Sequence, residues 1–175
     1  PVGTYTVSYT PSGVYASYPL TTASSNSVNV VGVGITYQGG DYGLNLPAGA
    51  TNIAVNLLPH TTITPGFPAW YDIQVCNIGI NPTGATVTMN YDPGLTYTFG
   101  SPVPASVNTS AHVITWNLPT MASGQCLYIQ ADFSASTSYQ IGDATFEFCS
   151  AYPTSGTDID LTNNTDTVHQ IVTGS

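Results

Sequence analysis

The sequence contains no lysine and no arginine, and its net charge of −9 at pH 7 comes from aspartates and the single Glu147. Without cations the chain cannot neutralise a phosphate backbone, which excludes nucleic acid as a partner. Anionic membrane surfaces repel it for the same reason. Lysine–carboxylate salt bridges and lysine–asparagine crosslinks are also excluded. Stability must therefore come from apolar burial, backbone hydrogen bonds and a disulfide or a metal ion.

The missing cations have more than one interpretation. A solvated acidic surface explains them in general terms. A protein exposed to protease-rich extracellular conditions would also gain from lacking every trypsin cleavage site, and proteolytic selection of a resistant fragment would leave the same composition. The sequence has no hydrophobic run long enough to span a bilayer and no signal peptide. A chain that opens at Pro1 is expected to be a processed segment, and we expect it to be secreted to the cell surface.

Cysteine is scarce, which excludes a disulfide-dense scaffold. The three residues are Cys76, Cys126 and Cys149, and their spacing matches no zinc pattern. Each falls opposite the aliphatic positions of its segment, so all three are expected to be surface thiols. Cys76 and Cys126 would meet as a cross-strand pair if their strands are antiparallel neighbours. Three free thiols and other pairings stay open.

Residues 70–79, Trp-Tyr-Asp-Ile-Gln-Val-Cys-Asn-Ile-Gly, give the clearest structural pattern. Tyr71, Ile73 and Val75 alternate with polar residues, a period of two that is typical of a half-buried β-strand. An Asn-x-Gly turn ends the segment, and Gly79 is expected to adopt a positive φ there. The inward positions would form one wall of an apolar core.

Similar alternation recurs along the chain between turn residues. In residues 125–135 it turns Leu127, Ile129, Ala131 and Phe133 inward, whereas residues 101–110 are expected to form a loop. No segment keeps a helical period with start and stop signals. The pattern predicts an all-β fold, an antiparallel Ig-like β-sandwich. The other expected strands are residues 4–9, 14–18, 27–37, 41–46, 52–58, 85–91, 95–99, 112–117, 143–152 and 165–172.

A Pro-Ala-Gly-Ala segment at residues 47–50 is expected to link two parts of the chain. Four short strands in residues 1–48 are too few for an independent core. This small β region is therefore predicted to be a partial or strand-donating module. Residues 49–175 would form the sandwich.

Several motifs in residues 50–175 are found together in a known family. They are Pro65-Gly66-Phe67, the strand ending in Asn77-Ile78-Gly79, Asp92-Pro93-Gly94-Leu95, Trp116-Asn117-Leu118, and Asp160-Leu161-Thr162-Asn163-Asn164. With them the segment resembles an Ig-like extracellular repeat of large bacterial cell-surface proteins, common among those exported by the type IX system. The resemblance implies a stalk, adhesin or fibre role and no enzymatic activity. Members usually contain lysine, and this chain departs from them there.

Residues 3–7 with residues 42–44 separately resemble the last strands of a prealbumin-like, collagen-adhesin B-type repeat, which often precedes such an Ig-like unit. We therefore expect a structural module of a secreted bacterial surface adhesin or extracellular filament. It would self-associate through β-strand and edge contacts. Its partners would be copies of itself or neighbouring modules of the same protein.

An acidic and amide-rich segment precedes the last expected strand. Such a density of oxygen ligands suits Ca²⁺, although the glycine and bidentate glutamate of an EF-hand are missing. The same side chains could instead satisfy backbone groups in a tight loop. The candidate ligands are Asp158, Asp160, Asn163, Asn164 and Asp166.

Catalytic motifs are absent from the sequence. His60, His112 and His169 are far apart and lack metal-ligand or catalytic spacing. Asp132 and Glu147 could face one another as a carboxyl pair, but both are interpreted as outward-facing and solvated. We therefore expect no enzymatic activity.

Tyrosines gather in the first quarter of the chain, where an exposed row could stack on the sugar rings of neutral glycans. The same row could dock a neighbouring module or simply cover a sheet. These residues are Tyr5, Tyr9, Tyr15, Tyr18, Tyr37 and Tyr42. Asn108 lies in an N-glycosylation sequon, and Thr167 lies in a motif that resembles the O-glycosylation signal of the same bacterial group.

Overall fold

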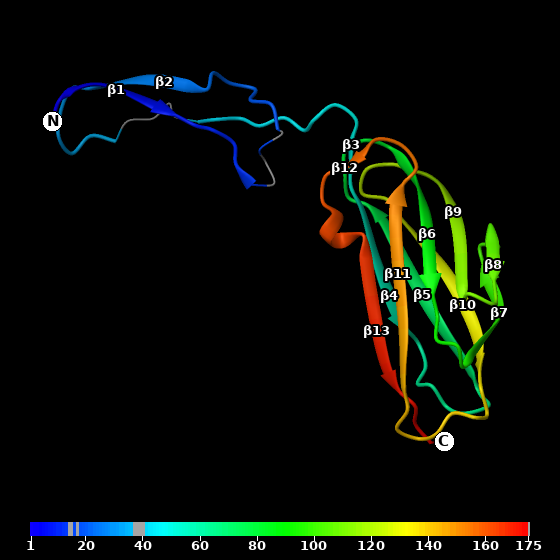
Figure 1. Ribbon diagram of the computed structural model, residues 1–175. Helices are drawn as coiled ribbons and strands as arrows, with labels where there is room; N and C mark the ends of the chain where they lie inside the picture. The colour runs from blue at the N-terminus through cyan, green and yellow to red at the C-terminus, as the bar shows by residue number, and fades with distance from the viewer. Residues whose placement is uncertain (14–15, 17, 37–40, 175) are drawn as a thin grey trace. The chain divides into compact units, whose positions relative to one another are not determined.

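The computed structural model describes residues 1–13, 16, 18–36 and 41–174 (Figure 1). The chain divides into two compact units, Pro1–Ala48 and Gly49–Ser175. Across the described residues the regular structure is β-strand with short 3₁₀ turns, and no α-helix occurs. The all-β prediction is therefore confirmed. None of the described residues forms a helix long and apolar enough to cross a membrane.

The larger unit consists of two antiparallel sheets and one short parallel pair. One sheet has the order β4-β5-β10-β7, the other has the order β13-β11-β6-β9-β8, and β12 pairs with β3. The strands are β3 (Ala50–Thr51), β4 (Ile53–Pro59), β5 (Pro68–Asn77), β6 (Thr83–Asn90), β7 (Leu95–Ser101), β8 (Ser106–Asn108), β9 (Val113–Met121), β10 (Cys126–Ala135), β11 (Ala144–Pro153), β12 (Thr157–Asp158) and β13 (Thr165–Ile171), with a 3₁₀ turn at Leu161–Asn163.

The apolar core lies between these two sheets and follows the predicted alternation of β5 and β10. Tyr71 and Ile73 from β5 are buried, as are Ile129 and Phe133 from β10. From the opposite sheet comes the fully buried Trp116, whose indole N–H donates to the carbonyl of Pro102 at 3.0 Å. Because each sheet hides its apolar face against the other, the unit is an Ig-like β-sandwich, as the sequence predicted.

Strand β11 has the opposite phase from the one that the sequence suggested. Glu147 and Cys149 are fully buried, so the predictions of a solvated glutamate and a surface thiol are wrong. Phe146 lies on the outside, where its ring packs edge-on against His169 at 4.7 Å between centroids. Trp116, Tyr71 and Phe133 already occupy much of the core, so β11 adds its smaller side chains there.

Two turns also differ from expectation. Gly79 does not adopt a positive φ. It is needed because a Cβ atom there would lie 2.6 Å from the backbone nitrogen of Asn52. The segment 101–110, expected to be a loop, contains β8, which pairs with β9.

The smaller unit contains one antiparallel hairpin. Strand β1 (Gly3–Ser8) pairs with β2 (Ser25–Val30), and the strand expected at 41–46 is reduced to a single bridge between Leu20 and Leu44. The strand expected at 14–18 lies largely outside the described residues. Every described side chain of Pro1–Ala48 is at least partly exposed to solvent. The hairpin therefore has no core within the part that the structure describes.

Candidate interaction surface

The solvent-facing side of the sheet β4-β5-β10-β7 carries an ordered array of polar and aromatic side chains, which we call the outer face. The antiparallel register of β5 and β10 sets its rows. Trp70 lies opposite Asp132, and two residues further along β5 the next outward residue lies opposite Gln130. Each outward residue therefore has a cross-strand neighbour within side-chain reach. The outer-face pairs are Trp70–Asp132, Asp72–Gln130, Gln74–Tyr128 and Cys76–Cys126.

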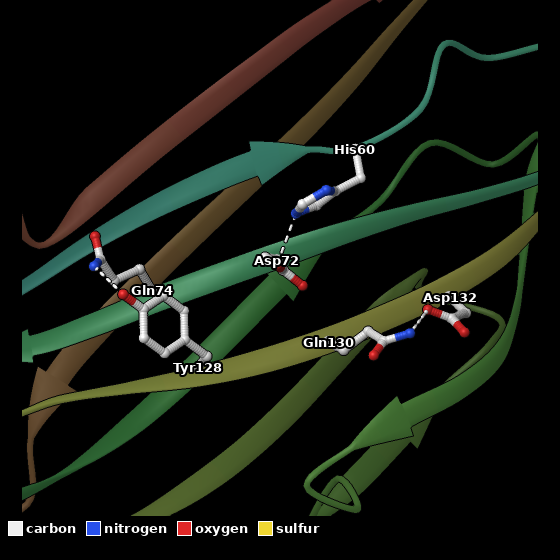
Figure 2. A network of polar contacts seen from close by, with 6 residues as sticks. All are labelled: His60, Asp72, Gln74, Tyr128, Gln130 and Asp132. Carbon is white, nitrogen blue, oxygen red and sulfur yellow. Dashed lines mark hydrogen bonds and ion pairs between the residues drawn. The ribbon is translucent and has the colours of Figure 1, made fainter.

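Hydrogen bonds hold the polar side chains of the outer face in place (Figure 2). The amide of Gln74 donates to the hydroxyl of Tyr128 at 2.7 Å, and the amide of Asn56 on β4 donates to Gln74 Oε1 at 3.1 Å. Along β10, Gln130 Nε2 donates to Asp132 Oδ1 at 2.8 Å. The contacts from Asn56 through Gln74 to Tyr128 run across three strands, and each hydrogen bond limits the rotamers of the side chains that it joins.

One ion-pair geometry lies on the same face. His60, which directly follows β4, places its Nε2 atom 2.7 Å from Asp72 Oδ2, so its protonated form would pair with this carboxylate. It is the only salt bridge among the described residues. The spacing of the histidines in the sequence indicated no partner for His60.

Three aromatic side chains of the outer face are exposed to solvent. The exposed fractions are 40% for Trp70, 52% for Phe99 on β7 and 58% for Tyr128. Phe99 lies opposite Asp132 from the β7 side, so it and Trp70 flank this carboxylate. Sequence reasoning missed these residues as a site. The signal was available, because the alternation that turns Tyr71 and Ile129 inward turns Trp70 and Tyr128 outward.

A disulfide lies at one end of the outer face. It joins Cys76 of β5 to Cys126 of β10, which are direct register partners 4.0 Å apart between Cα atoms. This is the pairing that an antiparallel arrangement of the two strands favoured. Cys149 is free and buried in the core, where loss of hydration raises the pKa of its thiol to about 12.

The acidic segment before β13 lies along the edge of β4. Asp158 Oδ2 accepts from the backbone N–H of Ile53 at 3.0 Å, and Asp166 Oδ2 accepts from the N–H of Leu57 at 2.8 Å. The buried Asn164 donates to the Ile53 carbonyl at 3.0 Å. These side chains therefore satisfy backbone groups that an edge strand would otherwise leave open.

The remaining candidate calcium ligands also form local contacts. Asp160 Oδ1 accepts from the N–H of Thr162 at 3.1 Å and from its hydroxyl, and both bonds lower the pKa of this carboxyl. Asn163 donates to Asn52 Oδ1 at 2.9 Å. Within the described ranges no three His, Cys, Asp or Glu side chains gather as a metal site. Calcium binding by this segment stays a prediction.

The two sheets differ in how open their edges are. Strand β4 is covered along its free edge by the contacts from Asp158 and Asp166. In the described part of the chain, β7 at the other end of the sheet pairs only with β10. Strand β8, the corresponding edge of the second sheet, has three residues. The backbone groups of β7 are therefore the longest uncovered edge on this side of the sandwich.

A polar cluster of buried and half-buried side chains lies near Glu147. The Tyr71 hydroxyl donates to Gln170 Oε1 at 2.7 Å, and the Tyr139 hydroxyl donates to Asp92 Oδ1 at 2.5 Å. Glu147 Oε1 has no hydrogen-bond partner. Burial of the carboxyl raises the pKa of Glu147 to about 7. The glutamate and Asp132 do not form the carboxyl pair considered from the sequence, because one is in the core and the other is on the outer face.

The tyrosines of the smaller unit do not all form a free row. Tyr9 stacks on Tyr42 with ring centroids 5.5 Å apart, and the Tyr42 hydroxyl donates to the Val7 carbonyl. Tyr5 donates to the Pro1 carbonyl at 3.1 Å. Tyr18 is partly exposed, and Tyr15 and Tyr37 lie outside the described residues. Glycan binding or self-association by these residues stays a prediction.

Both candidate glycosylation residues lie on the surface of the larger unit. Asn108 is exposed in β8, and its Oδ1 atom accepts from Ser110 Oγ at 2.8 Å and from the Ala111 N–H at 3.0 Å. Thr167 is exposed in β13. Modification of either residue stays a prediction.

The chain matches no protein-family model and no curated protein. Among solved structures it is similar to the cohesin module of a family 33 glycoside hydrolase from Clostridium perfringens, with a TM-score of 0.52, 7% identity and coverage of 71% of this chain and 99% of that one. It is also similar to a CARDB domain from Pyrococcus furiosus, with a TM-score of 0.49, 9% identity and coverage of 71% and 89%. A type III cohesin module of a cell-surface anchoring scaffoldin from Ruminococcus flavefaciens has a TM-score of 0.43 and 8% identity, and the match covers 68% of this chain and 73% of that one.

At these identities the similarity shows the fold alone. The two packed sheets make the larger unit an Ig-like β-sandwich domain, the cohesin module from Clostridium perfringens has a similar fold, and the sequence resemblance is supported to that level.

Proposed function

We propose that the chain is a non-catalytic structural module of a secreted bacterial surface adhesin or extracellular filament, and that it self-associates through its β-strands. One observation carries this proposal. The hairpin β1–β2 buries none of its described side chains, whereas the larger unit has a complete core. A hairpin with two solvated faces is marginally stable at best. Pairing with another copy would supply the missing partner surface.

The smaller unit offers apolar contacts for such pairing. Val31, Val33 and Ile35 are exposed, and Val33 is 97% accessible. Val33 and Ile35, together with Pro1, Val2 and Val30, line a pocket of about 210 Å³. Burying apolar surface of this kind stabilises an interface by about 25 cal/mol per Å². We propose that side chains of a second copy fill this pocket.

We propose β7 as the strand of the larger unit that receives a neighbouring strand. Its free edge has unpaired backbone donors and acceptors, while the β4 edge is occupied by Asp158 and Asp166. Strand addition uses main-chain hydrogen bonds for affinity and alternate side-chain positions for specificity. In this mechanism one edge accepts a partner and the other is protected from uncontrolled association.

An extracellular location accords with two features of the larger unit. A disulfide such as Cys76–Cys126 persists in oxidising compartments and is rare in the cytosol. The lack of lysine and arginine removes trypsin-type cleavage sites. We propose the cell surface as the location, and copies of the chain or adjoining modules as partners.

Deleting residues 1–10, which removes β1, tests this function. We expect the full chain to form oligomers or filaments and the deletion variant to be a folded monomer, as measured by light scattering, negative-stain microscopy and circular dichroism. Val7→Pro should act like the deletion because proline removes a strand donor, whereas the control Val7→Ala should still assemble. Unchanged assembly after the deletion, or a full chain that remains monomeric at high concentration, would refute the proposal.

A further inference from the structure

The outer face of the sheet β4-β5-β10-β7 combines flat aromatic surface with fixed polar groups. Trp70, Phe99 and Tyr128 project from three different strands of this sheet. Trp70 and Phe99 are separated by one strand, which places them about 10 Å apart, and Tyr128 lies about 13 Å along β10 from their row. The three side chains therefore outline a platform long enough for several sugar rings.

Trp70, Phe99 and Tyr128 lie outside the core of the larger unit, and each is partly exposed to solvent. None of the three contacts another ring among the residues that the structure describes. The core lies on the other side of the sheet and is complete without them. A large aromatic side chain placed on a solvated sheet face loses the burial that normally favours it. Their grouping on one face indicates a ligand that covers them.

The polar side chains between the aromatic residues indicate which functional groups a ligand would need. Amides and carboxylates alternate there and supply both donors and acceptors for hydroxyl groups. Hydrogen bonds to one another, to Tyr128 and to His60 hold them in place before any ligand arrives, which lowers the entropic cost of binding. These side chains are Asn56, Asp72, Gln74, Gln130 and Asp132.

Charge excludes anionic ligands from this surface. Asp72 and Asp132 lie on the outer face, the chain has no lysine or arginine to balance them, and His60 beside Asp72 carries a positive charge only when protonated. Sulfated or uronic-acid polysaccharides would therefore be repelled. An uncharged polysaccharide meets no such barrier, because its hydroxyl groups suit the polar side chains and the C–H faces of its rings suit the aromatic ones.

We infer that the outer face binds an uncharged polysaccharide, whose sugar rings stack on Trp70, Phe99 and Tyr128. The disulfide Cys76–Cys126 fixes the two strands that carry Trp70 and Tyr128 and thereby their spacing. This site lies wholly within the larger unit and differs from the tyrosine row of residues 1–48. It does not depend on the self-association proposed above.

The test uses the full chain and a panel of polysaccharides in pull-down and affinity electrophoresis. The uncharged members are cellulose, chitin, xylan, mannan and β-1,3-glucan, and the anionic members are alginate and heparin. We expect binding to at least one uncharged member and to neither anionic one. Trp70→Ala and Tyr128→Ala should each weaken binding by on the order of tenfold, which corresponds to the loss of one stacking contact of about 1.4 kcal/mol. The control Phe146→Ala, an equally exposed aromatic on the other sheet, should bind as the wild type.

Fluorescence gives a second readout, because Trp70 is exposed and Trp116 is fully buried. A bound saccharide should protect the Trp70 emission from acrylamide, and the Trp70→Phe variant should lose this protection. Binding to no uncharged member would overturn the inference. An equal loss of polysaccharide binding in Phe146→Ala would also overturn it. If Trp70→Ala instead converted a dimer to a monomer, the outer face would serve only to hold two copies together, and the inference would be wrong. Deletion of residues 1–10 should leave polysaccharide binding intact, so failure of either proposal can be told from failure of the other.

Discussion

Residues 49–175 and residues 1–48 use the same alternation of apolar and polar side chains, yet only the larger unit buries them. In the sandwich, β5 turns Tyr71 and Ile73 toward a second sheet that supplies Trp116. In the hairpin, β1 leaves Val7 exposed, because a two-stranded sheet of this unit has no second sheet of its own among the described residues. The comparison shows that alternation is sufficient to form a strand but that burial requires a second layer.

The two regions therefore differ in what their stability depends on. The larger unit has a core, a disulfide and one covered edge of its own. The smaller unit has backbone pairing and a few exposed apolar side chains. Substitutions should accordingly have large effects in the sandwich and small ones in the hairpin, unless the hairpin is bound to a partner.

The largest difference between the regions is expected for core truncation. Trp116→Ala should lower the free energy of unfolding of the larger unit by about 3–5 kcal/mol, because it removes the largest buried side chain and leaves a cavity. Val7→Ala in the hairpin should change it by less than about 0.5 kcal/mol. Urea denaturation followed by circular dichroism measures both values. Comparable losses in the two variants would mean that the hairpin shares the core of the sandwich.

Removing the disulfide should have the next largest effect and should also be confined to the larger unit. The Cys76→Ser, Cys126→Ser double variant opens a loop spanning 50 residues, and we expect a loss of about 2–4 kcal/mol. A reducing agent should destabilise the wild type to the same level and leave the double variant unchanged. Cys149 is the one cysteine left in the double variant. If this variant responded to the reductant, the Cys149 residues of two chains would have to form an intermolecular disulfide.

Much of the sandwich could be predicted from the sequence because β5 and β10 have long, regular alternation with apolar residues at nearly every inward position. The same regularity favoured the pairing of Cys76 with Cys126. The phase of β11 could not be read in this way. Phe146 and Phe148 alternate with Glu147 and Cys149, so the sequence offers two phases for this strand, and in the structure the glutamate and the cysteine are the buried pair.

The interaction surfaces were harder to predict because they depend on register between distant strands. The acidic segment was identified, but its contact with β4 joins residues more than 100 positions apart, such as Leu57 and Asp166. Trp70 and Tyr128 were assigned to strands but not to a shared face. Their grouping follows from the antiparallel register of β5 and β10, which one sequence does not specify.

Glu147 is an unfavourable feature inside the otherwise apolar core, and it should make the stability of the larger unit depend on pH. Its pKa rises from an ordinary value of 4.5 to about 7 on folding, so the native state holds the proton more tightly than the unfolded state. Its stabilising contribution is complete below pH 4.5 and is lost as the pH rises through 7. The loss amounts to about 3 kcal/mol at about 1.4 kcal/mol per pKa unit.

The variant Glu147→Gln tests this pH dependence. Between pH 4.5 and 8 its free energy of unfolding should change much less than that of the wild type, and above pH 7 it should be the more stable protein. Asp132→Asn, which changes a carboxyl on the outer face, should keep the wild-type slope. Parallel curves for the wild type and Glu147→Gln would show that the buried carboxyl is not the titrating group.

The covered edge of β4 should give the smallest effect, and its counterpart in the hairpin is the Tyr42 hydroxyl that donates to the Val7 carbonyl of β1. Asp166→Ala removes the acceptor for the Leu57 N–H and should lower the free energy of unfolding by about 1–2 kcal/mol. The neighbouring control Thr167→Ala should be neutral. If Asp166 acts only on the β4 backbone, the loss will be the same in EDTA and in millimolar Ca²⁺. A loss that appears only with Ca²⁺ present would instead assign Asp166 to a metal site. Newly formed dimers of Asp166→Ala would show that this carboxylate also keeps the β4 edge from pairing with another chain.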